Sequence, residues 1–370
     1  MLTRTRRQFL QTVVSAAAAA RTLTAQQARV RTIAGTARPA TDADDLWSPG
    51  GVDALRTPVS NPYGIVAGPD DALYFCEVDT GCTRRLDLGS RVVTTIAGNG
   101  RKGYAGDGGP AVAASFAAPH EIRFDRAGHL YVVERDAHVV RRIDAGTRVV
   151  STVAGTGVAG FSGDGGAAAA AQLRQPHSIA FDASGNLLIC DIANSRIRMV
   201  DMKTGVISTY AGTGQRGPTP DDAPREGTPL NGPRSIDTDP DGNVYLVLRE
   251  GNAVFRIDAA SRRLARVAGT GETGFSGDGG PALAARLNGP KGIAYASDRS
   301  LYIVDTENHA IRRIDLKSGT IATVLGTGRR GDGPDGDPLR CAMARPHGVF
   351  FHRGALYVTD SENHRIRVVE

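Results

Sequence analysis

Short apolar runs recur along the chain, and each has the length and composition of a β-strand. Between residues 176 and 211, four such runs (179–181, 187–191, 196–201 and 206–211) are separated by turns rich in Gly, Asn and Asp. Runs of about five residues bounded by turn residues are typical of an antiparallel meander. No run is long enough to predict a helix there, so we expect an all-β fold.

This four-strand unit repeats with a nearly constant period. Six prolines each open the first strand of a copy, and they lie 57, 57, 57, 57 and 56 residues apart. A fixed long period indicates a repeat architecture, and four short strands per copy are typical of a propeller blade. We therefore predict a six-bladed β-propeller of four-stranded antiparallel blades, anchored at Pro62, Pro119, Pro176, Pro233, Pro290 and Pro346.

The two ends of the repeat region predict how the ring closes. The sixth copy stops after its third strand, at residues 365–370, whereas a sequence typical of a fourth strand, residues 30–35, precedes the first copy. Pairing the two would complete the last blade with an N-terminal strand and remove the free sheet edges. The alternative is that residues 28–35 form a loose leader.

The repeat resembles the NHL repeat, which is named for an Asn-His-Leu triplet. Asn308 and His309 keep the first two letters, as do Asn363 and His364, and Asn194 keeps the first. The resemblance covers residues 28–370 and implies a propeller that serves mostly as a platform for a protein, peptide or glycan ligand. Three copies depart from the motif, with Thr80, Ala137 and Gly251 in place of the asparagine.

The N-terminus is expected to be an export signal. Residues 5–10 resemble a twin-arginine motif, a mildly apolar stretch follows at 11–20, and Ala25 precedes a plausible cleavage site. We expect residues 1–25 to be removed and residues 26–370 to form one propeller in the periplasm or outside the cell. The alternative is a basic tail on a cytosolic protein. The apolar stretch is shorter than the roughly 18 to 20 residues of a membrane span, so none is expected.

The net charge limits the expected binding partners, and the cysteines raise the question of a disulfide. Removal of residues 1–25, which hold four arginines and no acid, lowers the formal net charge from +5 to +1. A nearly neutral domain gives no reason to expect nucleic acid binding, and we expect a monomer. Cys76 and Cys82 flank a predicted hairpin turn, so they form either a disulfide, which export would permit, or two free thiols.

The residue after each anchor proline should enter the innermost strand near the mouth of the central channel. These six positions are Tyr63, His120, His177, Arg234, Lys291 and His347. Neutral imidazoles are good zinc ligands, and three protein ligands with an open site are typical of catalytic zinc. The other interpretation is that polar side chains line a wet channel.

The Pro-His context of these positions also resembles the amidating lyases, which are NHL-like propellers with a catalytic zinc. That resemblance implies His120, His177 and His347 as zinc ligands, with Tyr63 or Arg234 acting on the substrate. Ring order argues against a shared ion, because blades 2 and 3 are neighbours while blade 6 faces blade 3. We therefore expect no cofactor, with zinc as the alternative.

A second ring of acidic residues is predicted where the second strand of each blade ends. It contains Glu77, Glu134, Asp191, Asp305 and Asp360, and Leu248 interrupts it in blade 4. These carboxylates either face a ligand or cap a turn and pair with third-strand arginines such as Arg198, Arg312 and Arg367. The candidate ligand-binding face combines members of the two rings with one residue of the inserted segment 36–61, namely Lys291, Asp191, Asp305, Asp360 and Trp47.

Inserted segments of about twenty residues join successive blades. Residues 103–110, 160–166 and 274–281 are nearly identical Gly-Asp-Gly sequences, which predict a tight turn and a short helix capped by the Asp, or an anion-binding turn. The segments 36–61, with Trp47, and 217–226 differ, as expected for a partner contact or for drift. We expect a non-catalytic binding platform; the alternative is a metal-dependent lyase or hydrolase.

Overall fold

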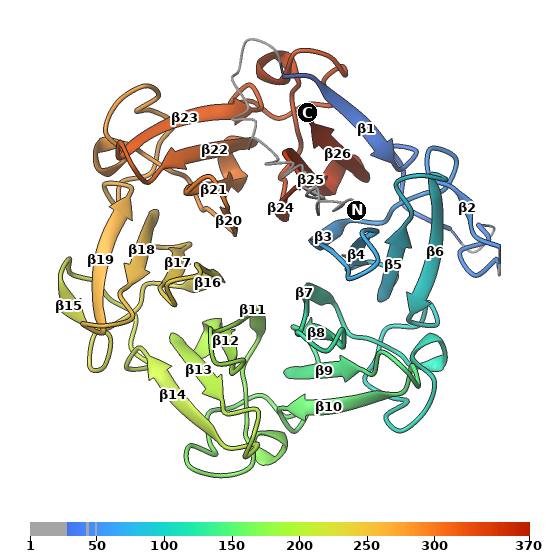
Figure 1. The fold of residues 1–370 in the computed structure, drawn as a ribbon, viewed down its shortest axis with the longest axis horizontal. Coiled ribbons are helices and arrows are strands. Elements are labelled where there is room, and N and C mark those ends of the chain that lie inside the picture. The colour runs from blue at the N-terminus through green and yellow to red at the C-terminus, as the bar shows by residue number, and fades with distance from the viewer. Residues whose placement is uncertain (1–27, 42–43, 49) are drawn as a thin grey trace, which may run out of the picture.

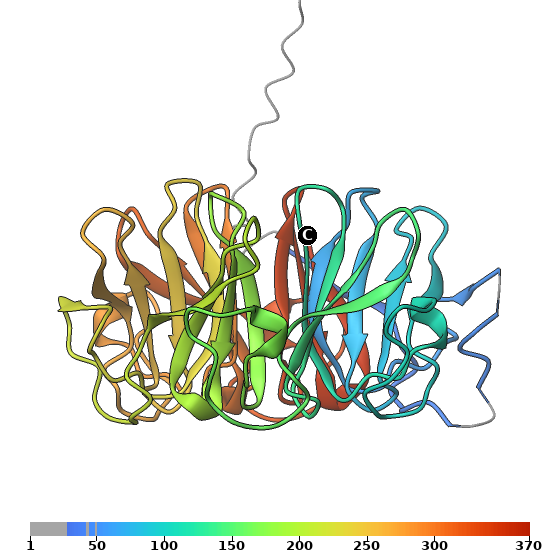
Figure 2. The same cartoon turned by 90° about the horizontal axis from the view of Figure 1, so that it is seen from below.

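The computed structural model describes residues 28–41, 44–48 and 50–370. Six sheets surround a central axis in chain order, with their innermost strands facing the channel (Figure 1). Seen from the side, the strands span the thickness of the ring and the loops lie on its two faces (Figure 2). The predicted all-β, six-bladed propeller is confirmed.

The blades follow the predicted repeats. Blade 1 contains β3 (Pro62–Ala67), β4 (Leu73–Glu77), β5 (Cys82–Leu86) and β6 (Val92–Ala97), with β2 (Val52–Asp53) on its outer edge. Blade 2 contains β7 (Pro119–Phe124), β8 (Leu130–Glu134), β9 (Val139–Ile143) and β10 (Val150–Ala154). Blade 3 contains β11 (Pro176–Phe181), β12 (Leu187–Asp191), β13 (Arg196–Val200) and β14 (Ile207–Ala211).

The second half repeats this arrangement. Blade 4 contains β16 (Pro233–Thr238), β17 (Val244–Leu248), β18 (Ala253–Ile257) and β19 (Arg263–Ala268), with β15 (Ala223–Pro224) on its outer edge. Blade 5 contains β20 (Gly292–Ala296), β21 (Ser300–Asp305), β22 (Ala310–Asp315) and β23 (Thr320–Leu325). Blade 6 contains β24 (Val349–His352), β25 (Ala355–Asp360), β26 (Arg365–Val369) and β1 (Val30–Ala34).

The N-terminal strand closes the ring. β1 pairs antiparallel with β26, so that Val30 lies opposite Val369 and Arg31 opposite Val368. Arg31 also forms an ion pair with Glu370 at 2.7 Å. The prediction that an N-terminal strand completes the sixth blade is therefore confirmed, and the alternative of a loose leader is wrong.

Short 3-10 helices are the helical elements of the described chain. Four lie in inserted segments, namely η1 (Ala111–Ala113), η2 (Ala168–Ala170), η4 (Ala282–Ala284) and η6 (Pro338–Arg340). Three lie between second and third strands, namely η3 (Ile192–Asn194), η5 (Thr306–Asn308) and η7 (Ser361–Asn363). Nowhere in these ranges is a helix long and apolar enough to cross a membrane. The predicted signal, residues 1–25, lies outside the described residues.

Neighbouring blades bury their apolar faces against each other. Between blades 2 and 3, Tyr131 and Val133 pack with Ile179 and Ile189, and all four are at most 2% exposed. Both faces of each second strand are covered in this way, which explains why these strands are continuous apolar runs rather than alternating ones. The core is thus a circle of interfaces that fixes the geometry of the channel.

The cysteines are free thiols, and all four are buried. In the β4–β5 hairpin, Cys82 lies opposite Glu77, and Cys76 lies opposite Thr83. This register places Cys76 and Cys82 one residue out of step, on opposite faces of the sheet. The disulfide interpretation is therefore wrong, and the free-thiol alternative holds.

Candidate binding site at the channel mouth

A left-handed residue before each anchor proline sets the direction of the strand at the mouth. Asn61, Ala118, Gln175 and Arg345 all have φ between 44° and 53°. This backbone conformation is unfavourable for residues other than glycine, so neighbouring contacts must hold it. The structure supplies such contacts from the preceding blade.

Histidines of the blade motif provide three of these contacts. The Nδ1 atoms of His138, His309 and His364 accept hydrogen bonds from the backbone N–H of Gln175, Arg345 and Asn61, at 3.1, 3.0 and 3.1 Å. Each histidine thus ties its own blade to the entry of the next strand, and His364 does so across the ring closure. The motif histidine therefore positions the mouth rather than binding a ligand.

The six predicted positions do converge at the mouth, and we call them the mouth ring. Tyr63 stacks on His347 with ring centroids 3.8 Å apart, and it contacts His120 edge to face at 4.7 Å. His120 in turn contacts His177 edge to face at 4.8 Å. Four aromatic side chains from blades 6, 1, 2 and 3 therefore form one continuous arc, with Arg234 and Lys291 completing the ring.

The ring histidines are held in the neutral state. The Nδ1 atoms of His120 and His177 lie 2.8 and 2.7 Å from the carbonyl oxygens of Ala118 and Gln175, so Nδ1 carries the proton and donates it. Burial lowers the pKa of His120, His177 and His347 well below the usual value, and nearby cations add to this effect. Neutral rings make the arc aromatic rather than cationic.

Arg234 is the exceptional member of the ring. It is only 6% exposed, yet no acceptor of the described residues lies within hydrogen-bonding distance of its guanidinium. Desolvation lowers its pKa to about 10. Burying a charge without a partner is costly, and no described residue offsets that cost for Arg234.

The neighbour of Arg234 in the ring, Lys291, is already neutralised. The Lys291 ammonium donates to Glu307 at 2.8 Å, and Arg345 forms ion pairs with Glu307 and Glu362 at 2.7 and 2.9 Å. Burial lowers the pKa of Lys291 to about 8, although the bond to Glu307 opposes that shift. The candidate ligand residue Lys291 is thus engaged within the protein, whereas Arg234 is not.

The ring does not form a metal-binding group. Tyr63 lies between His347 and His120, which separates the third predicted ligand from the other two. Across the described residues, no group of three or more His, Cys, Asp or Glu is arranged to hold a metal ion. The donor set His120, His177 and His347 therefore does not fit a zinc site. The assignment of Tyr63 and Arg234 as catalytic groups stays a prediction.

The second ring of acids is structural. Glu77, Glu134, Asp191, Asp305 and Asp360 have no exposed surface, and each lies beside a fully buried third-strand arginine. The corresponding nitrogen–oxygen distances are 3.3, 3.4, 3.7, 3.4 and 2.7 Å, to Arg84, Arg141, Arg198, Arg312 and Arg367. The candidate ligand residues Asp191, Asp305 and Asp360 thus cannot contact a ligand, and the arginine-pairing alternative is confirmed.

Third-strand arginines are also bound by the aspartate of an inserted segment, which lies on the solvent side of the arginine. Asp164 accepts from Arg198 at 2.6 Å, and Asp278 accepts from Arg312 at 2.8 Å. The prediction that this aspartate caps the following helix is wrong, because η1, η2 and η4 have no side-chain cap. Burial of the arginine explains the difference, since a guanidinium with five N–H donors needs acceptors on both sides.

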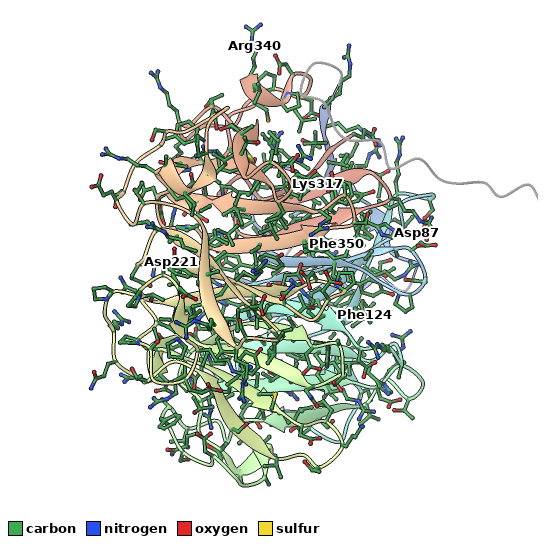
Figure 3. The ribbon with its side chains drawn as sticks, turned by 60° about the vertical axis from the view of Figure 1, so that its left-hand side comes forward. Asp87, Phe124, Asp221, Lys317, Arg340 and Phe350 are labelled. Carbon is green, nitrogen blue, oxygen red and sulfur yellow. The ribbon has the colours of Figure 1, made fainter. Side chains whose placement is uncertain are left out.

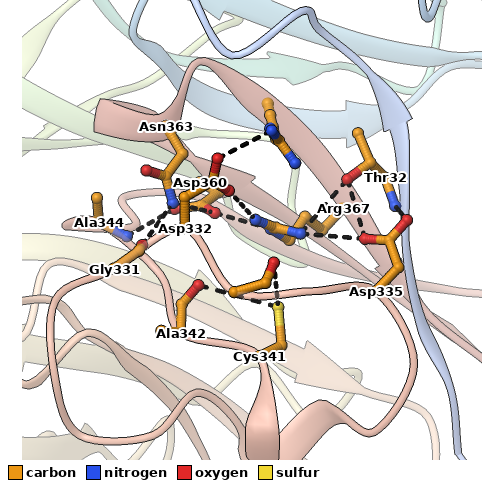
Figure 4. Close-up of polar contacts among 12 residues, drawn as sticks. Thr32, Gly331, Asp332, Asp335, Cys341, Ala342, Ala344, Asp360, Asn363 and Arg367 are labelled. Carbon is orange, nitrogen blue, oxygen red and sulfur yellow. Dashed lines mark hydrogen bonds and ion pairs between the residues drawn. The ribbon is translucent and has the colours of Figure 1, made fainter.

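An aromatic side chain and the motif asparagine complete what we call the buried arginine cluster. In blade 3, Phe161 covers Arg198 with the guanidinium 4.8 Å from the ring centre. Asn194 donates to Asp191 and to the Gly160 carbonyl, both at 2.7 Å. Figure 4 shows the version in blade 6, where Arg367 lies among Asp332, Asp335, Asp360 and Thr32 of the N-terminal strand.

Trp47 has the same role as the aromatics of the regular segments. Its exposed fraction, 43%, matches the 41% of Tyr104 and Phe275. Its ring covers Gly100, as the ring of Phe275 covers Gly328, so that an added Cβ at either glycine would clash. Its indole N–H donates to the Gly98 carbonyl at 3.1 Å. Trp47 therefore lies on the outer part of blade 1 and away from the mouth ring.

Sequence reasoning missed the structural role of the motif histidines and of the inserted aspartates. A signal for the aspartates was present: Asp107, Asp164 and Asp278 each precede a third-strand arginine by 34 residues. The histidine contacts leave no such signal, because they join different blades through backbone N–H groups.

Family profiles match the last third of the chain. The Teneurin NHL domain profile matches residues 265–345, and the NHL repeat profile matches residues 343–369. Together with the six four-stranded blades, these matches define the class of protein that the chain resembles: it is a six-bladed propeller similar to the NHL-repeat family.

Individual relatives are more distant. NHL repeat-containing protein 2 of Gallus gallus is 26% identical over 287 residues, which cover 70% of this chain and 39% of the relative. The chain spans well under half the length of the curated relatives it matches.

Solved structures share the fold. An auxiliary nutrient binding protein from Bacteroides ovatus superposes with a TM-score of 0.67 and 17% identity, covering 93% of this chain and 76% of that one. A streptogramin B lyase superposes with a TM-score of 0.54 and 15% identity, covering 85% and 95%. One architecture thus serves proteins described as a binder and as an enzyme, so function must be argued from the site.

Proposed function

We propose that this chain is an exported, non-catalytic propeller that binds the carboxylate of a peptide or of an acidic glycan at the mouth ring. The observation that carries the proposal is Arg234, a guanidinium that is buried but has no acceptor among the described residues. A carboxylate would supply two acceptors in the geometry that a guanidinium prefers. The twin-arginine-like sequence at residues 5–10 supports export.

The surroundings of Arg234 favour such a ligand. The aromatic arc beside it offers flat surfaces to an apolar or sugar ring. Next to the mouth lies an open hollow of about 560 Å³, lined by His138, Arg174, Gln175 and Arg216. Arg174 and Arg216 have no ion-pair partner in the described chain, so this side of the face is positively charged.

The test compares short peptides with a free C-terminal carboxylate and the same peptides with an amidated end, together with galacturonate and galactose oligosaccharides. Calorimetry should detect binding of the acidic member of a pair. Arg234→Gln should weaken it by about 10- to 100-fold, since a hydrogen bond to a charged group contributes roughly 1.5–3 kcal/mol.

Arg345→Gln is the matched control, because Arg345 lies at the same mouth but is paired with Glu307 and Glu362. It should leave the affinity nearly unchanged. The proposal would be wrong if amidated and free peptides bound equally well, or if both variants lost affinity to the same extent. Arg234→Gln should also unfold at the same or a higher temperature without ligand, because it removes an unpaired buried charge.

A further inference from the structure

Blade 4 lacks the buried arginine cluster that the other blades contain. One period after Asp191, Asn194 and Arg198 of blade 3, the chain has Leu248, Gly251 and Phe255. Leu248 and Phe255 are 1% and 3% exposed, so apolar side chains fill the position of the ion pair. The change is coordinated, because both charged members are replaced together.

The outer members of the cluster are changed as well. Pro218 stands in place of Phe161, and Arg266 stands in place of Thr209. Asp221 is retained, and it still accepts a hydrogen bond from the backbone N–H of the opposite strand, at 2.7 Å from Arg266 N. The inserted segment therefore keeps its course while losing the side chains that fill the space beneath it.

A pocket of about 330 Å³ occupies this space, and we call it the blade-4 pocket. Its floor is apolar and its rim is polar, and Figure 3 labels Asp221 of the same inserted segment. Cavities of roughly 300 Å³ and larger accommodate small organic molecules. The residues that define the pocket are Pro218, Thr219, Leu248, Glu250, Phe255 and Arg266.

The charges at the rim select the ligand. Glu250 forms an ion pair with Arg249, whose guanidinium donates to Glu250 Oε1 at 3.1 Å, while Glu250 Oε2 is buried without a hydrogen-bond partner. The Arg266 side chain has no hydrogen-bond or ion-pair partner among the described residues, and its Nε atom is buried. The uncompensated charge at the pocket is therefore positive, next to a floor made by Leu248 and Phe255.

We propose that the blade-4 pocket binds a small carboxylate that carries an aromatic or alicyclic ring. The ring packs on Phe255 and Leu248 under Pro218, and the carboxylate pairs with Arg266. This site is separate from the mouth ring and does not depend on the function proposed for it.

The test measures calorimetric binding of phenylacetate, indole-3-acetate and cyclohexylacetate, with phenylacetamide as the uncharged probe. We expect saturable binding of the acids. Arg266→Thr, which installs the residue of blades 2, 3 and 5, should weaken phenylacetate at least about 10-fold, the loss of one charge-assisted contact. Arg266→Thr should change the affinity for phenylacetamide little. Arg340→Thr removes an exposed arginine of another inserted segment (Figure 3) and should have no effect.

Two variants test the location by filling the pocket. Leu248→Asp combined with Phe255→Arg restores the charged pair, and Pro218→Phe restores the covering aromatic at an exposed loop position. Each should abolish binding, whereas Arg234→Gln should not. The proposal is overturned if none of the acids binds up to its solubility limit, if binding survives Pro218→Phe, or if phenylacetamide binds as tightly as phenylacetate.

Discussion

Blades 3 and 4 have the same backbone around opposite interiors. In both, the third strand pairs with its neighbours in the same register, and the irregularity falls at the same place, between Ile197 and Arg198 and between Val254 and Phe255. Blade 3 encloses Arg198, whereas blade 4 encloses Phe255. Strand register and apolar packing therefore suffice to form a blade, and the buried arginine cluster is an addition to it.

The largest effect is expected from breaking the cluster on one side. Asp305→Ala removes the fully buried partner of Arg312 and leaves it only the half-exposed Asp278, which should cost about 3–5 kcal/mol of unfolding free energy. Asp305→Leu combined with Arg312→Phe copies Leu248 and Phe255 of blade 4 and should cost much less, because no buried charge is left unpaired. Denaturant unfolding of both variants measures the difference. Equal losses would show that the comparison with blade 4 is mistaken.

The mouth residues of blade 4 and of blades 2 and 3 should respond differently to acid. Blades 2 and 3 contribute His120 and His177, which can take up a proton, whereas blade 4 contributes Arg234, which is already charged. The pKa of His120 is lowered in the folded state, so below pH 6.5 the unfolded chain binds the additional proton and stability falls with pH. The limiting slope is about 1.4 kcal/mol per pH unit for one histidine.

His120→Gln isolates this contribution, because every other titrating group is common to both proteins. The difference in unfolding free energy between the wild type and His120→Gln should be flat above pH 7. Below pH 6.5, the wild type should lose unfolding free energy relative to His120→Gln. A difference that is constant from pH 8 to pH 5 would contradict a neutral buried imidazole.

The aspartates of the inserted segments should also contribute more stability where the blade contains a buried arginine than in blade 4, which has none. Asp164→Ala removes an acceptor from the buried Arg198 and should cost about 1–3 kcal/mol. Asp221→Ala loses a backbone hydrogen bond at an exposed position and should cost about 0.5–1.5 kcal/mol. Thermal or chemical unfolding of the pair provides the measurement, and a larger loss at Asp221 would reverse the comparison.

The smallest effect is expected at Arg266. Arg266→Thr should change stability by no more than about 0.5 kcal/mol, because the side chain makes no hydrogen bond or ion pair with the described residues. If the variant is strongly destabilised in chemical unfolding, Arg266 supports the fold rather than a ligand.

Periodicity made the fold predictable in detail. The spacing of the prolines defined the blades, and the two incomplete ends of the repeat region predicted the pairing of β1 with β26. The strand starts were less regular, since β20 begins two residues after Pro290 and β24 three residues after Pro346. The sequence left a disulfide and two free thiols open for Cys76 and Cys82, because a hairpin places residues by register and a shift of one residue reverses the face.

The site was predictable in position but not in chemistry. The sequence located the mouth ring, because the residue after the anchor proline has the same position in every copy, although its type varies. It could not show that Tyr63 separates His347 from His120, or that Glu307 neutralises Lys291 and leaves Arg234 unpaired. The first property depends on contacts between blades, and the second on how a loop of blade 5 folds back on its own first strand; the repeat spacing shows neither.

The pairing of β1 with β26 also constrains when the molecule can become complete. The two strands are separated by the whole propeller, and Arg31 and Glu370 meet across 339 residues of sequence. During synthesis, β1 has no strand partner until the chain has been extended through the first five blades to β26. A chain interrupted before β26 would therefore retain two exposed sheet edges, a state that favours aggregation and degradation.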